Sequence, residues 1–473
     1  MRLSILLLAG CGTAAGPMAD GPGGDPMADG PAPDLLGAPC VREADCPDGL
    51  ACRLERIDDG DGVPESVAAT CLPENDVPAR TGDACVSDDE CRTGFCHLGI
   101  CSELCTQKSC PEGHSCNDVT SIAGGWIGPA SECPPAAQAP RVSACLPRIG
   151  VLDVALADAT HGQWTRLDVP SQAVSVTMMV QTDLAEVFVG VSALRAPDGS
   201  ALYDLPFTQP EFLAQPIRYF PTDRISTMLV PNTPDVAFLR GTHCFRFYAE
   251  GGATLRTRAR IKMAPGGAAA GGTLDLAVHI LDLSGMGCGV DGLTAGSAAT
   301  HMVMQDALGG AAGIFSQAGI TLGAVSYDDI VGRPDLDVID SLDGPDGDGV
   351  YEELNALLSE GTGTGDSVDI FLVRHIEGPV AIAGSIPGPP GAHALPHAGV
   401  AISMEAPCTT SLAKVLAHEV AHWLGLFHNI DSDGPDPIDD TDEGTANLMY
   451  ATSLGTDLTA GQVFVLRAHP AVR

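Results

Sequence analysis

The fold of this chain is decided by one stretch near its end, His418-Glu419-Val420-Ala421-His422-Trp423-Leu424-Gly425-Leu426-Phe427-His428. Two histidines four residues apart share one face of a helix, so both imidazoles can reach a single ion. Gly425 accepts a positive φ that other residues resist, which lets the helix end and the chain turn. The turn is expected to bring His428 in as a third nitrogen ligand.

Three protein ligands predict a catalytic zinc site, because a tetrahedral ion then keeps one position for water. The ion lowers the pKa of that water towards about 7. Glu419 follows the first ligand and is the predicted general base, which takes a proton as water attacks a carbonyl and later protonates the leaving amine. The competing interpretation is a helix that carries ordinary surface histidines.

The spacing H-E-x-x-H-x-x-G-x-x-H resembles the signature of the metzincin metalloproteases, and the resemblance covers residues 271–473. It implies an α/β zinc protease domain with His418, His422 and His428 as ligands. It also implies a methionine beneath the metal, and Met449 stands where this Met-turn is needed.

Two neighbouring segments are similar to the pappalysin-like bacterial branch of that family. They are the acidic segment before Met449 and the sequence Leu458-Thr459-Ala460-Gly461-Gln462 after it. In several metzincins a tyrosine two residues after the methionine approaches the zinc. That position is Ala451 here, and Tyr450 stands one place early, so Tyr450 as an oxyanion or zinc contact stays an open alternative.

Composition and the N-terminus predict an exported protein. The formal net charge of −37 argues against nucleic acid and anionic membrane surfaces as partners. Residues 1–11 combine a basic start and a short apolar run with Leu8-Ala9-Gly10-Cys11, which resembles a bacterial lipoprotein signal. The resemblance implies cleavage before Cys11 and a lipid anchor in the cell envelope, at the outer membrane or cell surface. The alternative is a secreted protein in which this cysteine is a coincidence.

Seventeen cysteines in an exported chain predict disulfide bonds. Residues 12–38 are predicted to be a flexible linker, and the next segment, 39–147, is a Cys-rich module with thirteen cysteines and little apolar content. Each bridge contributes about 2–4 kcal/mol there. Because thirteen is odd, one of these cysteines is expected to pair with Cys244, Cys288 or Cys408, although Cys288 and Cys408 can also bridge each other. Zinc binding by the cysteines is the competing interpretation, disfavoured because no C-x-x-C pair occurs.

Residues 148–265 are predicted to form strands, because β-branched and aromatic runs of strand length alternate with turn signals. Ala196-Pro197-Asp198-Gly199 and Gly241-Thr242-His243-Cys244-Phe245-Arg246-Phe247 resemble the β-sandwich modules that accompany secreted bacterial peptidases, which implies a β-sandwich module for structure or substrate docking. A glycine-rich linker follows, and the catalytic domain spans 271–473. The predicted strands there are residues 274–283, 320–325, 369–374 and 399–404, and the predicted helices are 301–318, 351–358 and 414–424. Residues 381–386 are expected at the sheet edge, where an extended peptide can pair.

Several polar residues have two possible roles. Thr409, Thr410 or Ser411 is expected to cap the zinc helix. His393 and His397 are predicted to be surface residues, with a second metal site as the alternative, and His161 and His243 are expected to be ordinary surface or core histidines. The acidic loops predict calcium or merely solvated charge; the first contains Asp337, Asp340, Asp343, Asp346 and Asp348, and the second contains Asp431, Asp433, Asp436, Asp439, Asp440, Asp442 and Glu443.

Together these patterns predict an exported, lipid-anchored zinc endopeptidase, monomeric, that acts on protein or peptide substrates. A hypothesis from another class is a surface binding or adhesion lipoprotein in which the protease domain is vestigial. A second enzymatic alternative is a zinc-dependent amidase that acts on cell-wall peptides.

Overall fold

The computed structural model describes residues 36–57, 66–106, 110–120, 128–130, 141–340, 351–409, 411–431, 434–441, 443–452 and 455–473. The predicted signal peptide with Cys11 and most of the predicted linker therefore lie outside the described residues. Six other predicted residues lie outside them as well: Asp343, Asp346, Asp348, Thr410, Asp433 and Asp442. Within the described ranges, no helix is both long and apolar enough to cross a bilayer.

The Cys-rich region consists of short hairpins cross-linked by disulfides. Its elements are η1 (Glu43–Asp45), β1 (Leu50–Ile57), β2 (Ser66–Pro73), η2 (Asp88–Glu90), β3 (Cys96–His97), β4 (Ile100–Cys101), β5 (His114–Thr120) and β7 (Arg141–Pro147). The bridges are Cys40–Cys52, Cys46–Cys71, Cys85–Cys96, Cys91–Cys101, Cys105–Cys116 and Cys110–Cys145. The predicted disulfide framework is confirmed, and these sulfurs are not available to a zinc ion.

The cysteines further along the chain are also oxidised. Cys288 and Cys408 bridge each other, with their Cα atoms 5.2 Å apart. Cys244 is disulfide-bonded too. Of the three partners expected for the odd cysteine, two are therefore used within the C-terminal domain.

Two antiparallel sheets follow the Cys-rich region. One has the strand order β14-β10-β16-β8 and the other β12-β11-β15-β9-β6, with β13 paired to β11. Their elements are β6 (Gly128–Ala130), β8 (Gly150–Ala155), β9 (Trp164–Val169), β10 (Ala173–Gln181), β11 (Phe188–Arg195), β12 (Ala201–Asp204), α1 (Gln209–Leu213), β13 (Thr222–Asp223), β14 (Ile225–Val230), β15 (Gly241–Ala249), η4 (Glu250–Gly252) and β16 (Arg256–Met263). Strands such as β10, with the sequence AVSVTMMVQ, suit a sheet because β-branched side chains pack well on a pleated surface.

Both sheets and the Cys-rich hairpins share one hydrophobic core. Phe95, Leu98 and Leu146 from the hairpins are fully buried in the same cluster as Val191 and Phe247 from the sandwich. The hairpins thus gain apolar packing from the sandwich in addition to their cross-links.

The C-terminal domain is built on a five-stranded sheet with the order β18-β17-β20-β23-β22. All neighbours are parallel except β22, which pairs antiparallel with β23 at the edge. Its elements are η5 (Pro265–Gly267), β17 (Thr273–Ile280), α2 (Ala295–Ala298), α3 (Met302–Phe315), η6 (Ser316–Ala318), β18 (Thr321–Asp329), β19 (Val338–Ile339), α4 (Glu352–Leu358), β20 (Val368–Val373), β21 (His375–Ile376), β22 (Ala381–Ala383), β23 (Val400–Ser403), α5 (Ala406–Thr409), α6 (Leu412–Trp423), β24 (Ile430–Asp431), β25 (Gly434–Pro435) and α7 (Ala460–Ala468).

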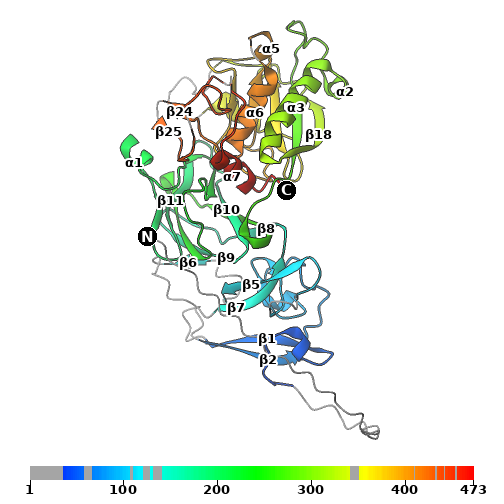
Figure 1. Cartoon of the computed structure of the whole chain (residues 1–473), viewed down its shortest axis with the longest axis vertical. Helices are drawn as coiled ribbons and strands as arrows, with labels where there is room; N and C mark the ends of the chain where they lie inside the picture. The colour runs from blue at the N-terminus through cyan, green and yellow to red at the C-terminus, as the bar shows by residue number, and fades with distance from the viewer. Residues whose placement is uncertain are drawn as a thin grey trace, which may run out of the picture. The chain divides into compact units, whose positions relative to one another are not determined.

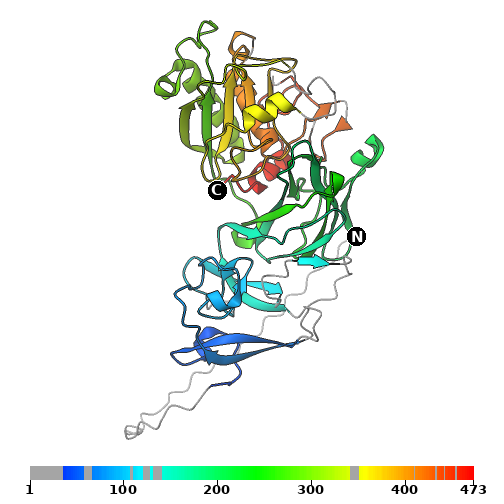
Figure 2. The same ribbon diagram turned by 180° about the vertical axis from the view of Figure 1, so that it is seen from behind.

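Helices cover both faces of this sheet, as the two opposite views in Figures 1 and 2 show. Helices α3 and α6 share the larger core with one face, and α4 packs on the other. The two helices of the first face lie side by side. A Cβ on Gly310 of α3 would lie 2.5 Å from the Cβ of Ala413 in α6, so this approach requires a glycine.

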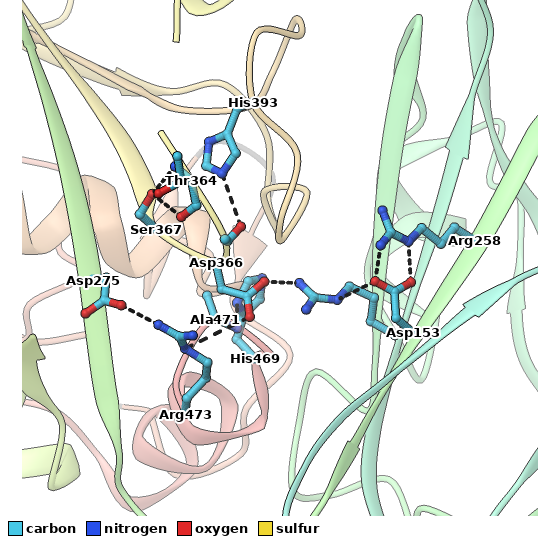
Figure 3. A network of polar contacts seen from close by, with 12 residues as sticks. Asp153, Arg258, Asp275, Thr364, Asp366, Ser367, His393, His469, Ala471 and Arg473 are labelled. Carbon is cyan, nitrogen blue, oxygen red and sulfur yellow. Dashed lines mark hydrogen bonds and ion pairs between the residues drawn. The ribbon is translucent and has the colours of Figure 1, made fainter. Parts of the chain in front are cut away.

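The sandwich and the C-terminal domain are joined by polar contacts along β16. Arg260 forms an ion pair with Asp366, which in turn meets Arg473, and Arg473 pairs with Asp275 (Figure 3). Lys262 is buried, and its ammonium group donates to three carbonyl oxygens of the C-terminal segment at 2.5–3.1 Å. Burial lowers the pKa of Lys262 to about 8, while these carbonyls favour the charged form.

Candidate metal centre

Helix α6 carries the first part of the motif, through Trp423, and most residues of this helix are buried. Every residue from Val415 to Trp423 is buried, so tertiary packing stabilises this helix. Ser411 is the N-cap residue, but its side chain makes no capping hydrogen bond. Of the three predicted capping residues, Ser411 therefore takes the N-cap position without the predicted hydroxyl hydrogen bond, and Thr410 lies outside the described residues.

The helix ends as the glycine in the motif predicts. Gly425 has a φ of +111°, and its N–H donates to the carbonyl of His422 at 2.8 Å. A side chain at this position would be strained by that φ, and its Cβ would lie 3.2 Å from Leu229 of the sandwich. The turn redirects the chain so that His428 returns towards the helix.

The three motif histidines converge through one nitrogen each. Nε2 of His418 lies 3.1 Å from Nε2 of His422 and 3.2 Å from Nε2 of His428. These three atoms form one of the groups in the described residues that are close enough to hold a metal ion. For zinc–nitrogen bonds of ~2.0–2.1 Å in a tetrahedron, neighbouring nitrogens lie about 3.3 Å apart. The donor set and its spacing therefore fit zinc.

Backbone carbonyls fix the orientation of two of the rings. Nδ1 of His418 donates to the carbonyl of Leu448 at 2.7 Å, and Nδ1 of His422 donates to the carbonyl of Leu426 at 2.6 Å. Because each Nδ1 carries the proton, each Nε2 presents a lone pair to the common centre. The sequence did not predict these two contacts, because every residue has a backbone carbonyl and the residue type does not show which carbonyl accepts a hydrogen bond.

The electrostatic environment keeps these ligands neutral. Burial lowers the pKa of His418 to about 4, although its hydrogen bond to Leu448 opposes the shift. Burial also lowers the pKa of His422 far below its usual value, and the neighbouring histidines lower it further. Both imidazoles are thus in the form that binds a metal at neutral pH.

The Met-turn is held in place from the other side. Met449 is fully buried; its N–H donates to the side chain of Asn447 at 2.8 Å, and its carbonyl accepts the N–H of Asn429, next to His428. Gln462 at the start of α7 locks the Asn447 amide through two hydrogen bonds of 3.0 and 3.1 Å. This paired amide fixes the turn whose Leu448 carbonyl orients the first ligand.

Tyr450 is half-buried, and its N–H donates to the carbonyl of Asn447 at 3.2 Å. Its phenol makes no hydrogen bond to another described residue. The structure gives no contact that would make Tyr450 an oxyanion group.

Glu419 is placed between the ligands and the sheet edge. Its side chain is buried, and its carboxylate accepts a hydrogen bond from the backbone N–H of Ala383 in β22. Burial raises the pKa of Glu419 to about 8, while the bond from Ala383 opposes the shift. A carboxylate in such surroundings is a stronger base than an exposed one.

The edge strand also leaves backbone groups open. Val380 and Gly384 bond to β23, through the N–H of Ser403 at 2.9 Å and the carbonyl of Gly399 at 2.9 Å. Because backbone groups alternate in direction along a strand, those of Ala381 and Ala383 face the other side. The N–H of Ala383 that reaches Glu419 agrees with this alternation.

The predicted calcium residues do not gather. Asp436 is buried, which raises its pKa to about 6, whereas a carboxylate oxygen of Asp440 accepts the N–H of Gly461 at 3.0 Å. The Asp439 N–H donates to Asp235 of the sandwich. Among the described side chains of this loop, which include Glu443 and not Asp431, no three carboxylates lie within ligand distance of one another.

The first acidic loop is described only in part. Asp337 accepts the N–H of Asp282, and the N–H of Asp340 donates to Glu353. The other predicted residues of this loop lie outside the described residues.

The prediction that His397 is a surface residue is wrong, and His393 is half-buried. His397 is only 5% exposed, and its two nitrogens contact the carbonyl of Gly384 and a carboxylate oxygen of Asp223. His393 contacts Asp369 at 2.6 Å and the carbonyl of Gly365 at 3.1 Å. Partners that are distant in sequence bury both rings, and neither belongs to a metal-ligating group among the described residues.

Comparison with known proteins adds little to this geometry. Neither protein-family models nor curated proteins give a match. Mature mirolysin of Tannerella forsythia, solved in complex with a cleaved peptide, is 15% identical over 42% of this chain and 91% of its own, with a TM-score of 0.26. An active-site mutant of a family two carbohydrate esterase from Clostridium thermocellum is 9% identical over 46% and 60%, with a TM-score of 0.14. At these TM-scores neither structure assigns a fold or a chemistry to this chain.

Proposed function

We propose that this chain is a zinc-dependent endopeptidase of the metzincin type. The observation that carries the proposal is the convergence of three histidines on a buried helix and its return turn, where Nε2 of His418 lies 3.1 Å from that of His422 and 3.2 Å from that of His428. A carboxylate with a raised pKa follows the first ligand directly. Three histidines with an adjacent glutamate are the residues that metal-assisted peptide hydrolysis needs.

The chain's own residues have distinct tasks in this reaction. His418, His422 and His428 would hold the zinc, which would supply a Lewis acid and a water of pKa about 7. The carbonyls of Leu448 and Leu426 keep two of the rings aligned. Glu419 accepts the proton of the attacking water and returns it to the leaving amine. The open side of β22 pairs with an extended peptide and lays it across the centre.

We also propose that the protein is exported and anchored by lipid at Cys11. The disulfides between described residues support export, because such bonds persist in oxidising compartments. The lipid anchor rests on the sequence Leu8-Ala9-Gly10-Cys11 alone. A bound calcium in the second acidic loop is a further proposal, which rests on its composition.

The test is cleavage of a denatured protein and a peptide library by the purified chain, with metal analysis of the same sample. Wild type should cleave, a chelator should stop cleavage, and zinc should restore it. Glu419→Gln should keep zinc and lose roughly 10³-fold in rate, because acid–base catalysis contributes ~10²–10⁴-fold. Glu405→Gln, on an exposed glutamate, is the matched control and should cleave normally. Zinc-free protein, or full activity in Glu419→Gln, would refute the proposal and favour a binding or adhesion protein.

A further inference from the structure

A buried acid–histidine pair connects the sandwich to the edge of the catalytic sheet. Asp223 lies in β13 of the sandwich and is 2% exposed. One of its oxygens lies 2.7 Å from Nε2 of His397, which is 174 residues away in the chain. The amide of Asn355 in α4 donates to both oxygens of Asp223 at 3.1–3.2 Å. The sandwich therefore places a carboxylate inside the catalytic domain.

The same histidine holds the end of the edge strand. Nδ1 of His397 lies 2.6 Å from the carbonyl oxygen of Gly384, the residue that follows β22. Both ring nitrogens face acceptors, so the ring makes both bonds when both nitrogens carry protons. A Cβ on Gly384 would lie 2.7 Å from the Cα of His397. The end of the strand and the loop that carries His397 are therefore in close contact.

Ala383, the last residue of β22 and the residue before Gly384, contacts Glu419, the proposed general base. The N–H of Ala383 donates to the carboxylate of Glu419, and Ala383 is bonded directly to Gly384. A displacement of the Gly384 carbonyl therefore moves the donor that orients Glu419. It also moves the open edge of β22, where the substrate backbone is expected to pair.

We propose that Asp223 and His397 are positioning residues for the active site, acting through the edge strand β22 on Glu419 and on the bound peptide. The sandwich is then a working part of the enzyme and not merely a docking module. This inference rests on the proposed function.

The charge state of Asp223 agrees with a rigid contact between Asp223 and His397. Burial alone would raise the pKa of Asp223, but the hydrogen bonds from His397 and Asn355 outweigh it and the pKa is lowered. The carboxylate is thus ionised at neutral pH. Charge-assisted hydrogen bonds are shorter and stronger than neutral ones, and loss of one partner leaves the other buried and uncompensated.

Full-length variants provide the test. Asp223→Ala removes the carboxylate, whereas Asp223→Asn keeps an acceptor for His397. His397→Asn suits the φ of +61° at this position, because asparagine tolerates left-handed backbone, but its side chain is too short to bridge both partners. Ser175→Ala is the matched control: its hydroxyl donates to the carbonyl of Ala468 across the same two domains, far from β22 in sequence.

Two measurements are made on each variant that folds and binds zinc. The first is the kcat and KM for a long peptide. Asp223→Ala and His397→Asn should lower kcat by roughly 10–100-fold, because a misplacement of about 1 Å can cost 10²-fold. Ser175→Ala should stay within about fivefold of wild type. Asp223→Asn keeps one acceptor for His397 but loses the charge and one acceptor for Asn355, so its kcat should lie between those of wild type and Asp223→Ala. The second is amide hydrogen exchange of residues 381–386, which should become at least about tenfold faster only in the first two variants.

The outcomes separate this inference from the proposed function. Unchanged kcat and unchanged exchange in both disruptive variants would overturn the inference and leave the peptidase proposal intact. If wild type hydrolyses nothing, the peptidase proposal fails, and the exchange of residues 381–386 still decides whether the pair holds the strand. If Asp223→Ala does not fold, His397→Asn and Ser175→Ala decide, since a positioning role requires the first to be slow and the second to be nearly normal.

Discussion

The C-terminal domain contains two histidine clusters that share one sheet and differ in how their nitrogens are used. In the metal centre, Nδ1 of His418 and of His422 donates to a carbonyl, and each Nε2 points to a shared centre. On the opposite face, His279 contacts Asp328 with one nitrogen and Asp369 with the other, at 2.8 and 2.9 Å. The first arrangement leaves a lone pair for a ligand, and the second leaves none.

The difference shows what distinguishes a ligand from a structural histidine. Carbonyl partners fix a neutral tautomer, so burial can keep the ring uncharged and ready for a cation. Carboxylate partners on both sides require a doubly protonated ring, which repels a cation. The partners of a ring therefore indicate its role better than burial does, because each cluster has a buried ring, such as His422 in the first and His279 in the second.

The largest effect is expected from removing a ring of the metal centre. His422→Ala should abolish zinc binding and cleavage, because the catalytic site loses one of its three protein ligands. Metal analysis after dialysis against a weak chelator measures it. His393→Ala, from the carboxylate-bound cluster, is the control and should retain one zinc per chain. Loss of zinc in both variants would show that the two clusters are not distinct in function.

The second-largest effect is expected on the stability of the protein, when the carboxylate of the second histidine cluster is removed. Asp369→Asn should lower the free energy of unfolding by about 3–5 kcal/mol, because Asp369 is the buried partner of both His279 and His393. Zinc content should not change. Denaturant unfolding measures the loss, and Asp335→Asn at an exposed carboxylate should change stability by less than ~0.5 kcal/mol. A near-neutral Asp369→Asn would mean that this network does not stabilise the domain.

The sequence was sufficient to predict the three histidines and the glutamate of the site. It was not sufficient to predict the surrounding residues that hold them in place. Residues 418–428 place their ligands through helix periodicity and one glycine turn, and those are local properties. The strands of the C-terminal domain were also predictable, because they are apolar runs between polar segments. The surface interpretation of His397 failed because its partner, Asp223, lies 174 residues away, and the contact of the half-buried His393 with Asp369 spans 24 residues. The orienting carbonyls could not be foreseen, since every residue has one.

A third prediction concerns pH and a buried neutral histidine. Burial lowers the pKa of His469 to about 3, and the nearby charges of Lys262 and Arg260 lower it further, against the effect of Asp366. The unfolded chain binds a proton near pH 6.5 while the folded chain does not, so stability falls as the pH falls below about 6.5. From pH 6.5 to 4.5 this residue alone should cost about 2–3 kcal/mol.

His469→Gln should reduce the loss of stability at acid pH, while His161→Gln on the surface should not. The measurement is the free energy of unfolding at several pH values. His393 should behave in the opposite way. Asp369 raises the pKa of His393 against the effect of burial, so its contribution is present below pH 6.5 and is lost as the pH rises through the folded-state pKa. The same acid slope in wild type and His469→Gln would contradict the assignment of a neutral buried ring.

The smallest effect is expected from a histidine on the surface. His375 lies 3.0 Å from Glu405, and the two side chains are 42% and 59% exposed. Geometrically this pair resembles the buried contacts of His279, but solvent screens it, so His375→Gln should cost no more than about 1 kcal/mol at low salt. A double-mutant cycle with Glu405→Gln isolates the pair, and its coupling should vanish as the Debye length drops to ~3 Å at 1 M salt. A coupling that exceeded 2 kcal/mol or persisted in high salt would mean that burial is not what separates a structural carboxylate–histidine contact from an incidental one.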